Sequence, residues 1–288
     1  MEPTILVQIV VSGLLIGLVY ALLAVGLTLI FGVMDIVNFA HGEFLMLAMY
    51  ITYWMWVLWS VDPVFSLPVT ALILFLIGAL TYRLVIRYVL DAPMLAQIFS
   101  TFGLMLFFRY LAQVLWTEDY RRIRGSLLEG RLEIAGVFLG RPEVAAALGG
   151  ILTTLLLYLF LKNTRVGWAL EATAENRTVA ALMGIDTEWM FTLAWGIGAA
   201  CAGIAGTLLA TFYPIFPEAG AVFVLVTYVA VALGGFGNIT GAFVGGVLIG
   251  LIQVLGGFLW EPRFKDVLVY AVYLLVVLAR PQGLLGRR

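Results

Sequence analysis

The apolar run that begins this chain constrains its fold more than any other feature. Residues 5–33 are almost wholly apolar, and a second apolar run, 44–59, follows after a short polar stretch. A helix that crosses a bilayer needs roughly 20 apolar residues. Over the whole chain 63% of the residues are hydrophobic and only 11% are charged, whereas a soluble domain has roughly 25% charged residues. The sequence therefore predicts an integral membrane protein.

Apolar runs of similar length recur along the 288 residues, and they predict an all-α, polytopic fold with eight or nine spanning helices. We expect one transmembrane domain, 1–288. Two runs, 221–234 and 266–280, are short, and short or glycine-interrupted segments are typical of helices broken near a substrate path. Packing or a mismatch with the bilayer thickness is the alternative. The predicted spans are 5–33, 36–59, 64–86, 95–116, 144–161, 188–211, 221–234, 240–260 and 266–280.

The distribution of basic residues predicts the orientation of these spans. The first 82 residues contain no Lys or Arg, and later basic residues gather at the end of the third span, in 162–187 and at the C-terminus. Because Lys and Arg favour cytoplasmic loops, we expect a periplasmic N-terminus and a cytoplasmic C-terminus in a bacterial inner (plasma) membrane. The segment 117–143 carries five Arg but also five acidic residues. We interpret it as a periplasmic loop, since long segments translocate despite their charge.

Residues 35–43, Asp-Ile-Val-Asn-Phe-Ala-His-Gly-Glu, place the only histidine and two carboxylates between two apolar runs. A charged side chain at the bilayer centre costs about 2.5–3.5 kcal/mol on insertion scales. One interpretation is a broken second span whose Asn38, His41 and Glu43 face a substrate path, because non-helical backbone at membrane depth must be protein-buried or line water. The alternative is structural: His41 and Glu43 bond neighbouring helices or cap a break, with Asp35 at the inner surface.

A further charged residue, Arg109, lies in the fourth predicted span. Its long side chain either reaches the membrane surface or pairs with Glu43.

Several kinds of chemistry are excluded by what the sequence lacks. It contains no G-x-x-x-x-G-K-[ST] phosphate loop, no H-E-x-x-H motif and no G-x-S-x-G elbow, and one histidine with one cysteine cannot build a zinc site. We therefore expect no metal, no cofactor and no catalytic residue in this chain. An acid–base enzyme built on Asp35, His41 and Glu43 is the remaining enzymatic alternative. The net charge of −1 argues against nucleic acid as a partner.

The segment 162–187 is amphipathic and too polar to span a membrane. It predicts two short helices, with Glu171 and Glu175 on one face and Gly184 as the C-cap of the second. Such a helical element fits the groove of a partner protein. The alternative is a helix lying on the membrane surface.

Four groups of motifs, in order along nearly the whole chain, carry a family resemblance. They are GLTLIFGVM (26–34) with NFAHGE (38–43), TRVG (164–167) with 172–175 and ALMGI (181–185), LGGFGN (233–238) with Gly241 and Ala242, and RPQGLLG (280–286). Together they resemble the LivH-type permease of branched-chain amino-acid ABC importers.

The resemblance implies a type II-like ABC importer permease that catalyses no chemistry itself. It would pair with a second, LivM-like permease, two cytoplasmic ATPase subunits that bind the ATP, and a periplasmic substrate-binding protein. The solutes implied are branched-chain amino acids or related amides and carboxylates, moved by alternating access. A different class, a stand-alone secondary transporter with coupling carboxylates at Asp35 and Glu43, is the alternative.

The resemblance also implies roles for particular residues. The family commonly has a basic residue before Ala172, where this chain has Glu171, so a charge contact with the ATPase does not carry over there. A helix break is expected at Gly234, Gly235, Gly237 and Asn238. The residues implied in ATPase coupling are Arg165, Gly167, Glu171, Ala172, Glu175, Asn176, Gly184 and Ile185.

Overall fold

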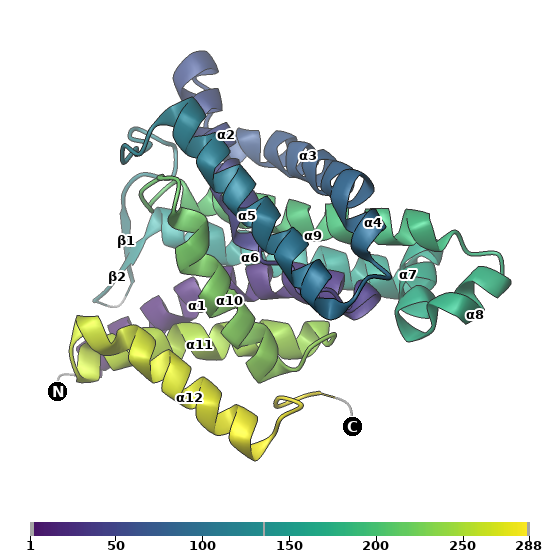
Figure 1. Cartoon of the computed structure of the whole chain (residues 1–288). Coiled ribbons are helices and arrows are strands. Elements are labelled where there is room, and N and C mark those ends of the chain that lie inside the picture. The colour runs from purple at the N-terminus through teal and green to yellow at the C-terminus, as the bar shows by residue number, and fades with distance from the viewer. Residues whose placement is uncertain (1–2, 135, 287–288) are drawn as a thin grey trace.

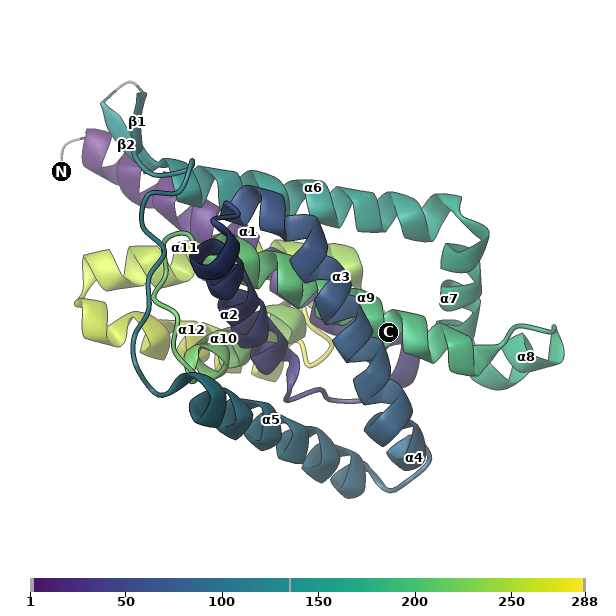
Figure 2. The ribbon, with the colours of Figure 1, turned by 90° about the horizontal axis from the view of Figure 1, so that it is seen from above.

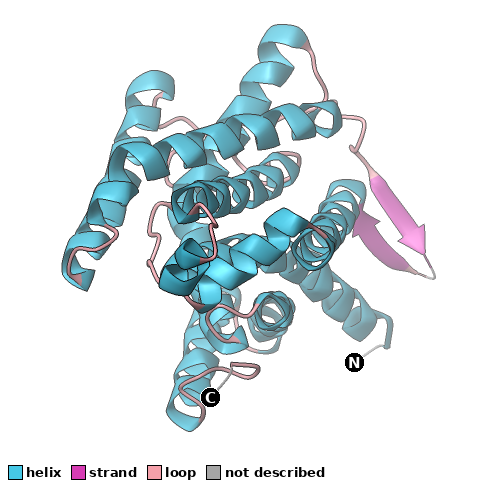
Figure 3. Cartoon of the chain, turned by 90° about the vertical axis from the view of Figure 1, so that its right-hand side faces the viewer, coloured by secondary structure: helices cyan, strands magenta, loops and turns pink. Residues whose placement is uncertain are grey.

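The structure is a computed structural model that describes residues 3–134 and 136–286, and helices dominate it (Figure 1, Figure 3). A five-residue π-helix, Tyr82–Ile86, continues α3, and a 3-10 turn, Pro262–Phe264, precedes α12. The strands β1 (Arg131–Ile134) and β2 (Val137–Gly140) form an antiparallel hairpin. The helices are α1 (Pro3–Met34), α2 (His41–Trp59), α3 (Pro63–Thr81), α4 (Arg87–Val89), α5 (Met94–Trp116), α6 (Arg141–Asn163), α7 (Arg165–Glu175), α8 (Arg177–Leu182), α9 (Thr187–Leu209), α10 (Ala219–Gly234), α11 (Ile239–Leu259) and α12 (Lys265–Ala279).

The bundle has two distinct ends, which we name by their elements. The hairpin end holds the β1–β2 hairpin and the start of α1, and the α7–α8 end holds the two short helices (Figure 1). The hairpin is tied to α1 because Gln8 Nε2 donates to the Phe138 carbonyl (2.6 Å) while the Phe138 N–H donates to Gln8 Oε1 (2.7 Å). The segment 117–143, predicted as a loop, therefore contains a hairpin, and α6 begins within it at Arg141.

The predicted polytopic helical fold is confirmed. Six helical stretches in the described residues are long and apolar enough to cross a membrane: Thr4–Met34, Pro63–Val89, Met94–Trp116, Arg141–Asn163, Thr187–Leu209 and Ile239–Leu259. The other three predicted spans correspond to the shorter helices α2, α10 and α12, of 19, 16 and 15 residues. The predicted start of the second span at residue 36 is wrong, because α2 begins only at His41.

The helices α1 and α9 form the centre of the bundle. In their most apolar windows 72% and 78% of the residues are buried, compared with 17% in α5. Small residues allow this close packing: a Cβ on Gly17 would lie 3.0 Å from the Val247 Cα of α11, and one on Gly250 would meet the backbone of Gly17. The small-residue spacing of Gly13 and Gly17 therefore serves packing within the chain.

The outer helices α3, α5 and α6 turn large apolar side chains outward. Examples are Leu72 (60% exposed), Val114 (82%) and Leu148 (61%). Figure 2 shows α5 and α6 on opposite sides of the bundle. An apolar surface of this extent indicates contact with lipid or with another membrane subunit.

Candidate translocation and coupling sites

The polar stretch 35–40 is an irregular segment that turns back into the bundle. α1 ends at Met34, and Asp35 then adopts a φ of +55°, a left-handed conformation that few residues other than glycine adopt. Asn38 Oδ1 accepts the Ala40 N–H (3.1 Å), and the Asn38 carbonyl accepts the His41 N–H (3.2 Å). These two bonds turn the chain into α2. Asp35 is exposed, while Asn38 is fully buried.

The first residue of α2 lies deep beside α1. His41 Nε2 is 3.2 Å from the carbonyl oxygen of Leu23. Leu23 precedes the end of α1 at Met34 by 11 residues, which is about 16 Å along a helix. The segment 35–40 therefore returns well inside the bundle before α2 begins.

The start of α10 meets the start of α2 at direct backbone contact. A Cβ on Gly42 would collide with the carbonyl oxygen of Gly220, and a Cβ on Gly220 would collide with that of Gly42. The chain that leads into α10 is also irregular, and it is anchored by a pair of backbone bonds between Ile215 and Arg121 (2.9 Å each). Two short helices thus begin inside the bundle, and their N-termini carry partial positive charge.

A buried ion pair links the same region to α5. Arg109 Nη2 donates to Glu43 Oε1 at 2.6 Å, and the side chains are 17% and 1% exposed. This contact confirms the second of the two alternatives for Arg109. Among the described residues, Glu43 Oε2 and Arg109 Nε have no hydrogen-bond partner.

The three predicted path residues are all buried, and they face different neighbours. Asn38 lies in the irregular segment, His41 faces α1, and Glu43 faces α5. In the described part of the chain, Asn38 Nδ2 and His41 Nδ1 have no hydrogen-bond partner. A buried polar group normally has a partner, so these two nitrogens are exceptions among the buried polar atoms.

Two cavities enter the bundle from its opposite ends, and neither is lined by Asn38, His41 or Glu43. The α7–α8 cavity, of about 470 Å³, lies between α1, α6, α7 and residues 236–240. The hairpin-end cavity, of about 990 Å³, lies between α1, α10, α11 and the start of α12. α1 lines both, and its residues 21–27 between them are buried. Along α1, these buried residues separate the two cavities.

Sequence reasoning missed the polar residues of the hairpin-end cavity. Tyr20 and Gln253 are buried inside otherwise apolar helices and reach Asp266 by hydrogen bonds. An amide inside the apolar run 240–260 was the available signal for this site, because polar side chains within spans are costly.

The predicted pair of short helices at 162–187 is present as α7 and α8. Thr164 Oγ1 accepts the Gly167 N–H (3.0 Å) at the start of α7, and Asn176 Oδ1 caps α8 through two backbone N–H groups. Gly184 has a φ of +85° and donates to the Ala181 carbonyl, while Ile185 donates to the Ala180 carbonyl. This is a Schellman motif, so the expectation that Gly184 caps α8 is confirmed.

The predicted coupling residues lie mainly on the surface of this element. Gly167 instead packs against the backbone of Leu161, and Ile185 is half-buried. Glu171 pairs with Lys162 at 2.9 Å. The exposed members are Arg165, Glu171, Ala172, Glu175, Asn176 and Gly184. Three apolar side chains of α8 and its cap, Val179, Leu182 and Met183, are 53%, 82% and 78% exposed.

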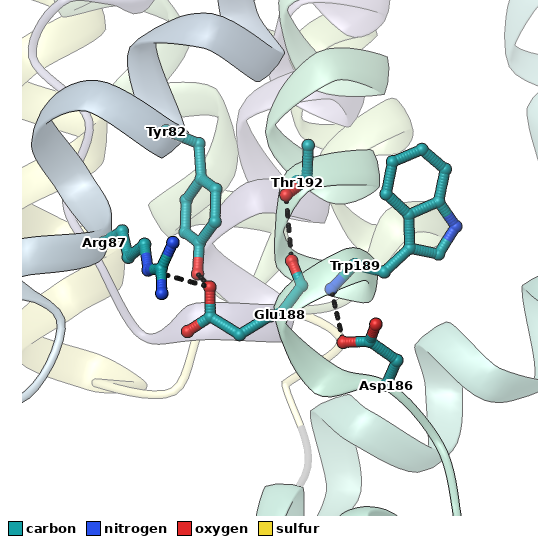
Figure 4. A network of polar contacts seen from close by, with 6 residues as sticks. All are labelled: Tyr82, Arg87, Asp186, Glu188, Trp189 and Thr192. Atoms are coloured by element: carbon teal, nitrogen blue, oxygen red, sulfur yellow. Dashed lines mark hydrogen bonds and ion pairs between the residues drawn. The ribbon is translucent and has the colours of Figure 1, made fainter.

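Polar contacts connect the start of α9 to the end of the third span (Figure 4), and one ion pair connects α8 to the turn after α4. Glu188 of α9 accepts the Tyr82 hydroxyl (3.3 Å) and pairs with Arg87 Nε (3.4 Å), and Asp186 caps α9 through the Trp189 N–H (3.0 Å). Arg177 of α8 pairs with Asp91 at 2.8 Å. α9 is thus tied to the end of the third span, and α8 to the turn that follows α4.

The predicted helix break at 234–238 is joined to the C-terminal segment by hydrogen bonds. α10 ends at Gly234, and both Gly235 and Gly237 have positive φ. Asn238 Oδ1 accepts the Gly241 N–H (2.9 Å) at the start of α11, and its Nδ2 donates to the Leu285 carbonyl (2.7 Å). The glycines allow the turn, and Asn238 connects the turn to Leu285 near the C-terminus.

No group of three or more His, Cys, Asp or Glu side chains that could hold a metal ion occurs in residues 3–134 and 136–286.

Spanning helices, two of the shorter helices starting inside the bundle, and a rigid polar element at one end together define a multi-pass membrane permease. A sequence profile of the family described as the permease component of branched-chain amino acid transport systems matches residues 9–277. The chain belongs to this family. It is a membrane permease subunit of an importer, a translocation subunit rather than an enzyme, and the ATPase is a separate protein.

Relatives match the chain over nearly its full length. The high-affinity branched-chain amino acid transport system permease LivH of Salmonella typhimurium is 31% identical over 96% of this chain and 94% of its own. The corresponding permease BraD of Pseudomonas aeruginosa is 30% identical over 97% and 95%. The probable branched-chain amino acid permease LivH of Methanocaldococcus jannaschii is 27% identical over 96% and 90%. No solved structure matches significantly.

Proposed function

We propose that this permease brings branched-chain amino acids, or related small amides and carboxylates, into the cytoplasm. It works with a second, LivM-like permease, two ATPase subunits that bind ATP, and a periplasmic substrate-binding protein. The observation that carries the proposal is the α7–α8 element, a capped pair of helices with exposed apolar side chains at one end of a membrane bundle. The names of the relatives, branched-chain amino acid permeases, support the class of solute.

The orientation in the inner membrane follows from the same element. We place the α7–α8 end in the cytoplasm and the hairpin end, with 117–143 and the N-terminus, in the periplasm. Basic residues at the α7–α8 end, such as Arg83, Arg87 and Arg177, support this assignment through the positive-inside rule.

The mechanism is alternating access driven from α8. Closure of the ATPases on ATP moves α7 and α8 as one rigid lever, and the contacts at Glu188 and Asp91 pass the movement to α9 and to the end of the third span. The buried part of the bundle, where α1 residues 21–27 separate the two cavities, is the barrier that opens. Such coupling between distant sites is an energetic linkage.

The proposed contact between α8 and the ATPase predicts that changes in α8 reduce stimulated ATP hydrolysis. Leu182→Ser and Met183→Ser each remove an exposed apolar side chain that an ATPase groove would bury. A buried side chain of this size contributes roughly 1.5–3 kcal/mol, so we expect ATP hydrolysis stimulated by the substrate-loaded binding protein to fall about tenfold or more. Leu127→Ser, at an exposed leucine of the hairpin end (67%), is the control. Full stimulation in both α8 variants would contradict the proposal.

The path assignment of Asn38 and His41 predicts altered transport with intact assembly. Each has a buried nitrogen without a partner in the described chain, and we propose that these atoms bind water or solute. We expect Asn38→Ala and His41→Ala to raise the KM for import about tenfold, a change of about 1.4 kcal/mol, at matched expression. Glu43 belongs to the same proposed path.

A matched control lies on α2, the helix that begins at His41. Thr52 is buried and has its partner, because its hydroxyl donates to Thr207 Oγ1 at 3.0 Å. Thr52→Ala should therefore lower stability without changing KM. Loss of assembly in the Asn38 and His41 variants, instead of a changed KM, would favour the purely structural interpretation.

A further inference from the structure

The hairpin-end cavity carries a polar wall inside the apolar bundle. Tyr20 of α1 is 5% exposed and Gln253 of α11 is 9% exposed, and both line this cavity. Polar side chains within spanning helices are costly and commonly functional. The cavity, at about 990 Å³, is of the size that holds small ligands.

Hydrogen bonds along this wall orient one carboxylate. The Tyr20 hydroxyl donates to Gln253 Oε1 (2.6 Å), and Gln253 Nε2 donates to Asp266 Oδ1 (2.8 Å). Because Gln253 uses its oxygen for Tyr20, its nitrogen faces Asp266, and the carboxylate is held as an acceptor. Asp266 is half-buried and Gln253 contacts its Oδ1, which leaves its Oδ2 available to a donor in the cavity.

Aromatic rings surround the same space. The ring centroids of Tyr20 and Phe223 are 6.1 Å apart, and those of Tyr213 and Phe223 are 5.0 Å apart in an edge-to-face arrangement. Tyr270 also lines the cavity. The faces of aromatic rings attract cations, and a carboxylate beside them adds the opposite charge.

We propose that this cavity binds the primary ammonium group of a small ligand with an apolar body, and that Asp266 is its counter-ion. The apolar body packs on side chains such as Ile9, Ile16 and Val254, which line the rest of the wall. The basic residues of the cavity, Arg131 and Lys265, are both exposed, so they flank its opening and do not neutralise the buried wall. The assignment of this cavity as the entry site for solute from the periplasm rests on the proposed function.

A ligand series tests the charge requirement without any variant. The full chain, with the subunits that co-purify with it, is placed in nanodiscs without ATP, and binding is followed by saturation-transfer NMR. Isoamylamine should bind at least tenfold more tightly than 3-methylbutan-1-ol or isocaproate, a difference of about 1.4 kcal/mol. Equal binding of the three, or no binding of the amine, would overturn the proposal.

A variant locates the site. Asp266→Asn should weaken isoamylamine binding about tenfold, while Glu261→Gln, at an exposed carboxylate that pairs with Arg263 (2.6 Å), should leave it unchanged. If Asp266→Asn fails to assemble, Ser12→Cys on the cavity wall provides the test. Its thiol should react faster with a cationic than with an anionic methanethiosulfonate, and isoamylamine should slow the reaction. Cys201 is 3% exposed and supplies little background. Equal rates would count against the ammonium site.

Transport measured in parallel separates the two proposals. If the complex imports solute on ATP but shows no preference for the amine, the proposed function is supported and the ammonium site is refuted. If the complex binds the amine through Asp266 but does not import solute on ATP, the ammonium site is supported and the proposed function is refuted.

Discussion

Gly42→Ala is expected to destabilise this protein strongly, although it adds only one methyl group at a helix crossing. The added Cβ would collide with the carbonyl oxygen of Gly220, at the point where α2 and α10 begin. Overpacking typically costs about 1–3 kcal/mol, and we expect the upper end because the neighbour is backbone and cannot change rotamer. Thermal denaturation of the purified protein and its yield in membranes are the measurements.

Gly103→Ala on α5 is the matched control, because a Cβ there has no neighbour within 4 Å. Alanine is about 1 kcal/mol better than glycine inside a helix, so this variant should be neutral or slightly more stable. Gly220→Ala should behave like Gly42→Ala, since it meets the carbonyl oxygen of Gly42. Wild-type stability in both variants would show that α2 and α10 do not cross at these glycines.

Arg109→Ala is the second change with a large expected effect. It leaves the Glu43 carboxylate, 1% exposed, without the guanidinium that lies 2.6 Å away. Removing one partner of a buried ion pair costs about 3–5 kcal/mol. We therefore expect a lower unfolding temperature and detachment of α5, a helix in whose most apolar window only 17% of the residues are buried. Denaturation, together with protease sensitivity around residues 90–93, measures both.

A double variant separates the ion pair from simple packing. Glu43→Leu with Arg109→Met replaces both charges by apolar groups of comparable size, a change that is often neutral. We expect the double variant to recover most of the stability lost in Arg109→Ala. As a control, Arg263→Ala breaks an exposed pair and should cost no more than about 1 kcal/mol. A double variant as unstable as Arg109→Ala would contradict the pairing.

Local patterns in the sequence predicted the helices and their caps. Apolar runs of about 20 residues correspond to helices, because a chain in lipid must satisfy its backbone within the segment. The break before α11 was also predicted from its glycines and its asparagine. In the structure Gly235 and Gly237 adopt positive φ, and Asn238 caps the next helix. These features depend on residues a few positions apart.

The second span shows where local pattern failed. The span predicted from residue 36 began too early, because Ile36 and its neighbours run without helix back into the bundle. The segment packs in part on α5, where Thr101 Oγ1 donates to the Val37 carbonyl at 2.9 Å. Hydrophobicity is the same for a buried irregular segment and for a helix, so the two were indistinguishable without the neighbours.

The sequence by itself therefore determined the class of protein, most of its helices and the capped element α7–α8. The tertiary structure decided which polar groups meet. Glu43 pairs with Arg109 across 66 positions, and Tyr20 reaches Gln253 across 233. The physical reason is that helix formation depends on neighbouring residues, whereas these contacts depend on how closely distant helices approach. That approach is set at small-residue crossings such as Gly42 with Gly220 and Gly17 with Gly250.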